Sequence, residues 1–347
     1  MELLLSQIAP AKLSSRNTIS IWQDNLKTAD ELTIASGYIS SDALIELAKI
    51  VEINRKPQID LLIGMHWFDG FTHQQYEAAA SLNRMLSERK LGGVYLSNKV
   101  RFHGKIYAFS TNEICTSAII GSSNLSSFIG SSERLYETDC YFTEGSETKS
   151  ILATLDQLFD KLATPLNEMP TPTVFKEYND LLEDHYWVER VNNERFADVQ
   201  STKTGREFSI LIKPEPKSHL NCFFGKGRES KRGFVLPRPW YEVEIMAGST
   251  MTSQPGYPRG KEFTVITDDQ WSFKCLTQGD YFKNLRSTED LKIMGKWIKG
   301  RMEARGALKI GEPVTQATFD HYGNQHLILS ETTDPDIWLL DFSPDKE

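Results

Sequence analysis

The stretch RFHGKIYAF places His103 and Lys105 two residues apart. Because alternate side chains of a strand project from the same face, a strand here would present the imidazole and the ammonium together. The next apolar run ends in a glycine-serine turn that contains Ser122 and is followed by Asn124. Imidazole attacks phosphorus, while an ammonium and an amide NH₂ bind non-bridging phosphate oxygens. Either motif alone is a common accident, but together on neighbouring strands they predict a phosphodiester site that needs no metal.

The segments around this motif alternate between strand-like and helix-like patterns. ELTIASGYI and QIDLLIG are typical of buried strands, and ALIELAKIV and HQQYEAAASLNRMLSERK of helices. RFHGKIYAF, SAIIG and TDCYF follow as three strand candidates, before the amphipathic helix TKSILATLDQLFDKLA. This alternation predicts an α/β sandwich with a mixed sheet over residues 1–162, which would hold the candidate catalytic residues.

The pattern of apolar and turn-forming residues changes after residue 162. ATPLNEMPTPT is rich in proline and opens an expected linker or connector over residues 163–200. From residue 201 to 347 short apolar runs follow one another, among them EFSILIKP, HLNCFF, EFTVITDD, WSFKCLT and HLILS. One helix-like segment, KWIKGRMEAR, interrupts them, and we expect Trp297, Ile298 and Met302 to face inward with its cations solvated. Many short strands with one helix predict a mainly β domain, a small β-barrel with helical decoration.

Charge is distributed unevenly along the 347 residues. The whole chain carries −8, but residues 1–200 hold 18 Lys+Arg against 27 Asp+Glu, while residues 201–312 hold 20 against 13. A basic block of +7 beside an acidic block of −9 suits a polyanion-binding surface confined to the second domain. A solvated, lysine-rich surface is the alternative, and charge counting does not decide between them.

Other compositional features bound the protein class. No apolar run approaches the ~20 residues that cross a bilayer, and the opening MELLLSQIAP lacks the basic region of a secretion signal. The four cysteines have no metal-ligand spacing, so we expect them to be reduced in a cytoplasmic protein without zinc or another cofactor.

HGK followed by GSSN resembles the HxK…GSxN signature of the phospholipase D superfamily. The resemblance implies that His103 is the nucleophile and forms a covalent phosphohistidine, that Lys105 and Asn124 bind phosphate, and that Ser122 assists with a hydrogen bond. In that family an acidic residue after the asparagine orients the histidine. At the family spacing this chain has no acid, and we expect Glu137 to take the role because it directly precedes an apolar strand, with Glu133 as the alternative.

Two further departures bear on the mechanism. Ser110 stands where the family has an aspartate after the lysine. The chain also carries a single HxK motif, whereas the family mechanism uses two histidines, the second as general acid. We therefore expect a homodimer with one catalytic centre at a two-fold interface. His66 follows a predicted strand without a lysine two residues on, and we expect it to belong to loop structure.

One HxK motif followed by a basic β-rich domain resembles the phospholipase-D-type restriction endonucleases of the BfiI and NgoFVII kind. Their C-terminal domain is related to the plant B3 fold, a pseudobarrel that places two loop arms in the DNA major groove. The resemblance implies a sequence-specific, metal-independent type II endonuclease acting on double-stranded DNA, with a cognate DNA methyltransferase as functional partner and no membrane. The alternatives are a phosphodiesterase acting on RNA, DNA ends or lipid, and a non-catalytic DNA-binding protein.

Two polar loops are the candidate DNA-reading arms, although either could be a solvated hairpin loop. Cations that can neutralise phosphates or read guanine concentrate in the first loop, which holds Lys226, Arg228, Lys231, Arg232 and Arg238. The second loop mixes donors and acceptors that suit base edges, and it holds Gln278, Asp280, Tyr281, Lys283, Asn284 and Arg286.

Overall fold

The computed structural model describes residues 1–6, 12–13, 16–129, 135–143, 145–176, 181–183, 185–229 and 233–344. The chain divides into two compact units. The first comprises Met1–Tyr178 with Arg228–Pro237, and the second comprises Asn179–Gly227 with Arg238–Glu347. The boundaries expected from the sequence, 1–162, 163–200 and 201–347, stay a prediction. None of the described helices is long and apolar enough to span a membrane.

The first unit is built on a mixed sheet with the strand order β1-β7-β6-β5-β2-β3-β4-β8. Its strands are β1 (Glu2–Leu5), β2 (Glu31–Ser36), β3 (Gln58–Ile63), β4 (Gly92–Ser97), β5 (Lys105–Thr111), β6 (Ile114–Gly121), β7 (Thr138–Thr143) and β8 (Ala163–Pro165). The pairs β2–β3 and β3–β4 are parallel, and the other pairs are antiparallel. The predicted mixed α/β sheet is confirmed.

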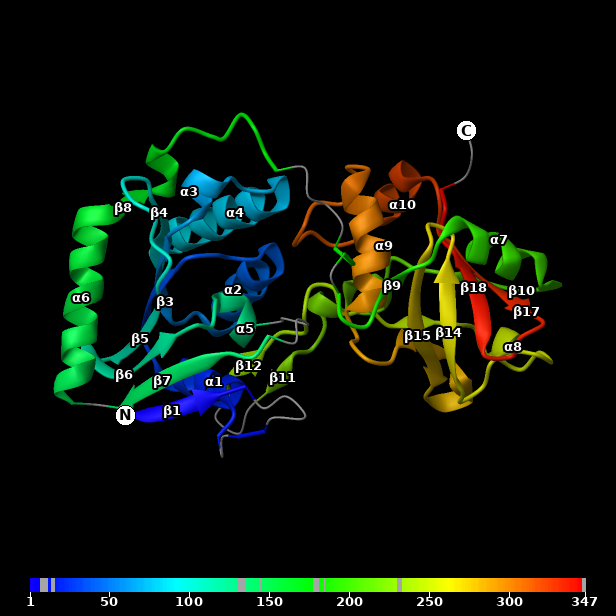
Figure 1. Cartoon of the computed structure of the whole chain (residues 1–347), viewed down its shortest axis with the longest axis horizontal. Helices are drawn as coiled ribbons and strands as arrows, with labels where there is room; N and C mark the ends of the chain where they lie inside the picture. Colours follow the sequence, from blue (N-terminus) through cyan, green and yellow to red (C-terminus); the bar gives the residue numbers. More distant parts are fainter. Residues whose placement is uncertain are drawn as a thin grey trace. The chain divides into compact units, whose positions relative to one another are not determined.

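Helices cover both faces of this sheet (Figure 1). They are α1 (Thr18–Thr28), α2 (Ser41–Asn54), α3 (His66–Asp69), α4 (His73–Arg89), α5 (Leu125–Phe128) and α6 (Ser146–Leu162). On one face, Leu155 of α6 is packed in a cluster with Ala35, Leu62 and Ala108 of three strands. On the other face, Trp22 of α1 stacks on the Phe128 ring. A capping box at Thr72 fixes the start of α4, because four N–H groups of a helix start lack intrahelical partners.

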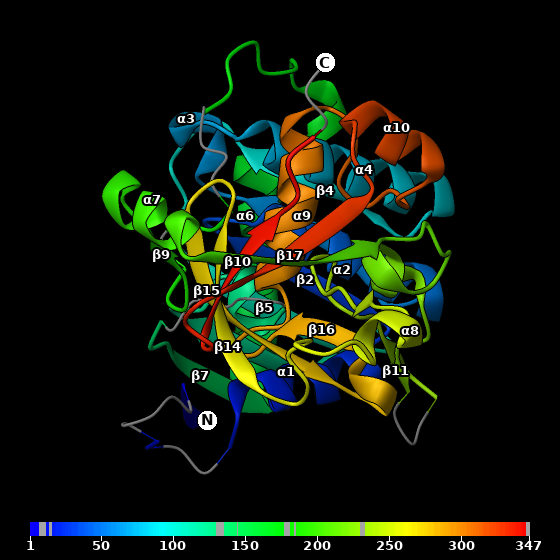
Figure 2. The same cartoon turned by 90° about the vertical axis from the view of Figure 1, so that its right-hand side faces the viewer.

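The second unit contains an open, mainly antiparallel sheet with the path β10-β17-β18-β14-β15-β16-β13, and β9 pairs with β15 (Figure 2). Its strands are β9 (Glu189–Arg190), β10 (Lys203–Leu211), β13 (Ile245–Met246), β14 (Glu262–Thr267), β15 (Trp271–Gln278), β16 (Asn284–Ser287), β17 (His326–Thr332) and β18 (Ile337–Asp341). Only β14 and β18 pair in parallel among these described strands. The predicted mainly β second half is confirmed.

Helical segments complete the second unit. They are α7 (Asn193–Ser201), the 3₁₀ segment η2 (His219–Phe224), α8 (Ser249–Thr252), the 3₁₀ segment η3 (Asp280–Phe282), α9 (Ile293–Ala304) and α10 (Gln316–Tyr322). Segment η2 corrects the expectation of a strand at HLNCFF. Its consecutive residues from His219 to Phe223 are all buried, whereas a half-buried strand alternates.

Helix α9 packs its apolar residues into the core, as expected. Trp297, Ile298 and Met302 are buried. The expectation that the cations of this helix are solvated is wrong for Lys299, which is also fully buried. Its ammonium donates to the Trp240 carbonyl oxygen at 2.6 Å and lies 3.7 Å from the centroid of the Trp240 ring. A lysine in this position is part of the core rather than of a nucleic-acid surface.

Candidate active site

The two halves of the motif meet at one edge of the first sheet. Lys105 begins β5 and pairs with Ser36 at the end of β2, while Ile106 pairs with Ile120 near the end of β6. Because β5 and β6 are antiparallel, the start of one lies beside the end of the other. His103 directly precedes β5, and Asn124 follows β6 at the start of α5. The neighbouring strands that the motif requires are therefore present.

His103 and Lys105 are in direct contact. Lys105 Nζ lies 3.2 Å from His103 Nε2 and donates to the His103 carbonyl oxygen at 2.8 Å. The imidazole is exposed, whereas Lys105 is buried. Burial lowers the pKa of Lys105, and the nearby Glu137 carboxylate acts in the opposite direction. An ammonium donating to Nε2 requires a lone pair there, which is the form of imidazole that acts as a nucleophile.

A glycine allows the backbone to approach the histidine closely. Gly37 N donates to the Gly104 carbonyl oxygen at 3.0 Å. A Cβ atom on Gly37 would lie 3.2 Å from both Cα and Cδ2 of His103, so a side chain would push against the histidine. The loop after β2 thus sets the position of the imidazole.

The turn that follows β6 is fixed by two carboxylates. Ser122 Oγ donates to the Glu137 carboxylate, and Ser127 Oγ donates to Glu137 Oε1 at 3.2 Å. One residue further, Ser123 Oγ donates to Asp139 Oδ2 at 2.6 Å, and Ser123 N donates to Asp139 Oδ1 at 3.1 Å. Asp139 is buried, and its burial raises the pKa of this carboxyl. The two serines of the GSSN turn are therefore held by hydrogen bonds to Glu137 and Asp139.

Glu137 is engaged with this turn. Within the described part of the chain, no hydrogen bond joins its carboxylate to the His103 ring, the contact that the resemblance implied. Its carboxylate nevertheless acts on the motif, since it opposes the lowering of the Lys105 pKa by burial. The alternative acid, Glu133, lies outside the described residues.

Three residues that the sequence analysis did not single out, Tyr38, Asp69 and Arg101, lie at this edge of the sheet. The Tyr38 ring makes edge contacts with the rings of His103 and His66, at centroid distances of 5.6 and 5.4 Å. Its N–H donates to Asn124 Oδ1 at 3.4 Å, and its hydroxyl donates to Asp69 Oδ2 at 2.6 Å. Asp69 in turn accepts from Arg101 Nε at 3.3 Å. The alternation R-x-H-x-K was the available signal for Arg101.

His66 begins the short helix α3 instead of lying in the expected loop, and backbone groups hold its ring. Its Nε2 accepts from Ile39 N at 3.2 Å, and its Nδ1 lies 3.1 Å from the Gly70 carbonyl oxygen. The ring is buried and stacks on Phe71. Burial lowers the pKa of His66, so the neutral ring with Nδ1–H is favoured. Both nitrogens are thereby occupied by backbone groups.

The first candidate DNA loop is divided between different surroundings. Lys226 and Arg228 are exposed, and Arg228 lies in the short hairpin β11 (Arg228–Glu229) and β12 (Val235–Leu236), which belongs to the first unit. Asn54 holds this hairpin, since its Nδ2 donates to the Val235 carbonyl and its Oδ1 accepts from Val235 N, both at 2.8 Å.

Of the remaining cations of the first candidate loop, the structure describes Arg238, which is ion-paired. Arg238 donates to Glu242 and Glu244 at 2.8 and 2.9 Å, and these carboxylates raise the pKa of the guanidinium against the effect of burial. Because the Arg238 guanidinium already pairs with two carboxylates, it offers a phosphate little net positive charge. Lys231 and Arg232 lie outside the described residues.

The second candidate loop joins β15 to β16. Asp280 and Tyr281 are exposed, the tyrosine to 69% of its surface, and Lys283 Nζ lies 5.1 Å from the Tyr281 ring centroid. Gln278, at the end of β15, is half-buried and pairs with Asn284. Asn284 Oδ1 and Arg286 Nε are buried and have no hydrogen-bond partner among the described residues. These two atoms are closed off from solvent, so the exposed candidates of this loop are Asp280 and Tyr281.

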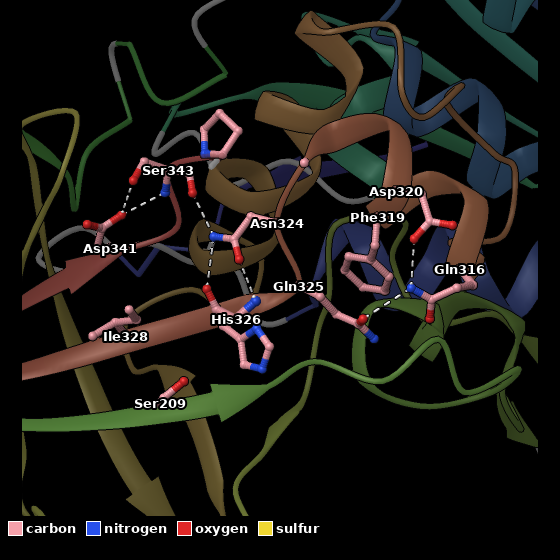
Figure 3. A pocket seen from close by; sticks show the side chains of 12 residues that line it. Ser209, Gln316, Phe319, Asp320, Asn324, Gln325, His326, Ile328, Asp341 and Ser343 are labelled. Carbon is pink, nitrogen blue, oxygen red and sulfur yellow. Dashed lines mark hydrogen bonds between the residues drawn. The ribbon is translucent and has the colours of Figure 1, made fainter. Parts of the chain in front are cut away.

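A cavity of about 710 Å³ lies at the other end of that sheet. Figure 3 shows that its amide side chains already make hydrogen bonds. Asn324 Nδ2 donates to the backbone carbonyl oxygens of His326 and Ser343, and Gln316 Nε2 donates to the side chains of Asp320 and Gln325. Its carboxylates would repel a phosphate. Among the described residues, no three His, Cys, Asp or Glu side chains form a group that could hold a metal ion.

Comparison with known proteins agrees with this two-part organisation. The family model of the NgoFVII restriction endonuclease N-terminal PLD domain matches residues 15–169. The family model of the NgoFVII C-terminal B3-like DNA-binding domain matches residues 198–333. No curated protein sequence matches the chain.

Among solved structures, the chain is similar to Nuc, a phospholipase D family member from Salmonella typhimurium, with 13% identity and a TM-score of 0.33 over 47% of this chain and 95% of that one. It is also similar to phosphatidylserine synthase of Haemophilus influenzae, with 11% identity and a TM-score of 0.34 over 49% and 41% of the two chains. The two family models match most of the chain, in the order of the two units and with the expected folds. The chain belongs to the NgoFVII family of restriction endonucleases, with a phospholipase-D-type N-terminal domain followed by a B3-like DNA-binding domain.

Proposed function

We propose that this protein is a type II restriction endonuclease that cleaves double-stranded DNA without a metal ion, through a covalent phosphohistidine at His103. The observation that carries the proposal is the contact of 3.2 Å between Lys105 Nζ and His103 Nε2 on an exposed imidazole. The nucleophilic nitrogen and a phosphate-binding cation are thus adjacent at the sheet edge where Asn124 also lies.

The reaction follows from these positions. A non-bridging phosphate oxygen draws Lys105 away from Nε2, which frees the lone pair for attack on phosphorus. The new N–P bond forms as the P–O bond to the leaving strand breaks, and Lys105 and Asn124 stabilise the charge on the phosphoryl oxygens. Water then attacks phosphorus, the N–P bond breaks, and the 5′- or 3′-phosphate product leaves. Ser122 and Glu137 hold the turn, and Glu137 supports the charged form of Lys105.

The leaving oxygen needs a proton, and a second histidine would supply it as a general acid before recovering a proton from the attacking water. His66 is unsuited to this role because both its ring nitrogens face backbone groups. We therefore propose a homodimer in which His103 of a second copy is the acid, with one centre on the two-fold axis.

DNA recognition belongs to the B3-like domain in this proposal. The second loop, with Gln278, Asp280, Tyr281, Lys283, Asn284 and Arg286, provides base and phosphate contacts, and the exposure of Asp280 and Tyr281 supports this role. From the first loop, Lys226 and Arg228 remain exposed candidates. A cytoplasmic location and a cognate methyltransferase stay predictions.

The test is incubation of the purified protein with unmethylated plasmid or phage DNA in excess EDTA. We expect discrete fragments from the wild type and intact DNA with His103→Ala, while both bind DNA equally. Fragments from both proteins, or a requirement for added Mg²⁺, would refute the proposed mechanism.

A further inference from the structure

A second cation stands beside the proposed reaction centre. Arg101 precedes His103 by two residues, and two residues of chain span at most about 7 Å. Its side chain is 60% exposed, in contrast to the buried Lys105. The Cα atoms of Arg101 and His103 are therefore separated by a distance similar to that between successive phosphates of a DNA strand.

The guanidinium of Arg101 is held in a defined orientation. Asp69 Oδ1 accepts from its Nε at 3.3 Å, and the Phe68 ring lies under it with the Cζ atom 5.1 Å from the ring centroid. Both partners belong to the short helix α3. Within the described chain, the Asp69 bond is the hydrogen bond that Arg101 makes, so its terminal nitrogens keep their donors. A planar fork fixed through Nε is suited to bind a phosphate with its remaining N–H groups.

This arginine is also linked to the nucleophile. The Tyr38 hydroxyl donates to Asp69 Oδ2 at 2.6 Å, and the same ring contacts the His103 ring. The hydrogen bond from Tyr38, followed by the contact with Arg101, lowers the pKa of Asp69, so this carboxylate stays ionised. Tyr38 and Asp69 therefore fix where Arg101 lies relative to His103.

We propose that Arg101 binds the DNA phosphate next to the scissile one, so that the catalytic domain holds two successive phosphates of the cleaved strand. This inference rests on the proposed function and names how its substrate is held. Residues 1–162 hold 15 Lys+Arg against 19 Asp+Glu, a net charge of −4, so the catalytic domain offers DNA no overall attraction and must bind it through local cations. A diester with a single phosphate would use Lys105 and Asn124 but not Arg101.

Two substrates separate this role from a structural one. The wild type, Arg101→Ala, Asp69→Asn and His103→Ala are compared on a cleavable DNA duplex and on bis(p-nitrophenyl) phosphate, with Arg84→Ala on the exposed face of α4 as matched control. We expect Arg101→Ala to lower kcat/KM about tenfold or more for DNA, but less than about twofold for the small diester. The slope of log K for DNA binding against log salt should fall by about 0.9, as for one lost phosphate contact.

The outcomes are distinguishable. Equal losses on both substrates, or no loss on DNA, would refute the second phosphate site and leave the proposed function intact. A fully active His103→Ala, or a wild type that cleaves neither substrate, would refute the proposed function itself.

Discussion

Replacing Lys299 with methionine should change how the stability of the B3-like domain depends on pH. Lys299 is fully buried, and burial lowers the pKa of its amine from 10.5 to about 7. Between these two pH values the unfolded chain binds a proton that the folded chain lacks. The free energy of unfolding therefore rises with pH across this window, by up to about 1.4 kcal/mol per pH unit. Below pH 7 both states are protonated, and the folded state bears the whole penalty of about 5 kcal/mol.

Methionine removes the charge but also the donor to the Trp240 carbonyl oxygen. Leaving that buried acceptor unsatisfied costs about 1–2 kcal/mol. Lys299→Met should thus be more stable than the wild type by about 3 kcal/mol at pH 6. The advantage should shrink by about 3 kcal/mol between pH 7 and 9 and vanish toward pH 9.

The assay is urea unfolding of the full chain at pH 6, 7, 8 and 9, followed by tryptophan fluorescence. Lys274→Met is the matched control, because Lys274 lies on β15 with 51% of its side chain exposed. The difference in unfolding free energy between Lys274→Met and the wild type should not increase toward low pH. Parallel curves of unfolding free energy against pH for the wild type and Lys299→Met would mean that the amine keeps its ordinary pKa in the folded protein, and would contradict this prediction.

Two further predictions concern the catalytic domain. Asn54→Ala removes two hydrogen bonds to Val235 and should weaken the attachment of the hairpin 228–237 by about 1–3 kcal/mol. Amide hydrogen exchange should then become faster in that hairpin alone. Unchanged exchange would contradict this prediction. Glu137→Gln weakens the hold on Ser122 and should lower DNA cleavage about tenfold or more without changing DNA affinity, and full activity in a single-turnover assay would remove Glu137 from the site.

The catalytic half was predictable because its signals are local. Apolar runs marked β2, β3, β5, β6 and β7, and the short connection between β5 and β6 made them neighbours, which brought His103 and Asn124 to one edge. Arg101 could have been found from its spacing to His103. Tyr38 and Asp69 could not, because their contact depends on two different strand ends that the topology brings together.

The second half was harder to predict because its structure depends on distant partners. HLNCFF has the apolar content of a strand, but Asn221 within it donates to the Glu215 and Val314 carbonyl oxygens, and these bonds stabilise a 3₁₀ segment. The hairpin at Arg228 is held by Asn54, which lies 181 residues before Val235. A charge count likewise could not separate the buried Lys299 from solvated lysines.

Trapping the covalent intermediate tests the phosphohistidine mechanism most directly. The protein is mixed with cleavable DNA in EDTA, quenched within a single turnover under alkaline denaturing conditions that preserve phosphohistidine, digested and analysed by mass spectrometry. A phosphohistidine mechanism predicts a nucleotide adduct on the peptide that contains His103, absent from His103→Ala. Cleavage at full rate with no adduct on His103 would contradict it.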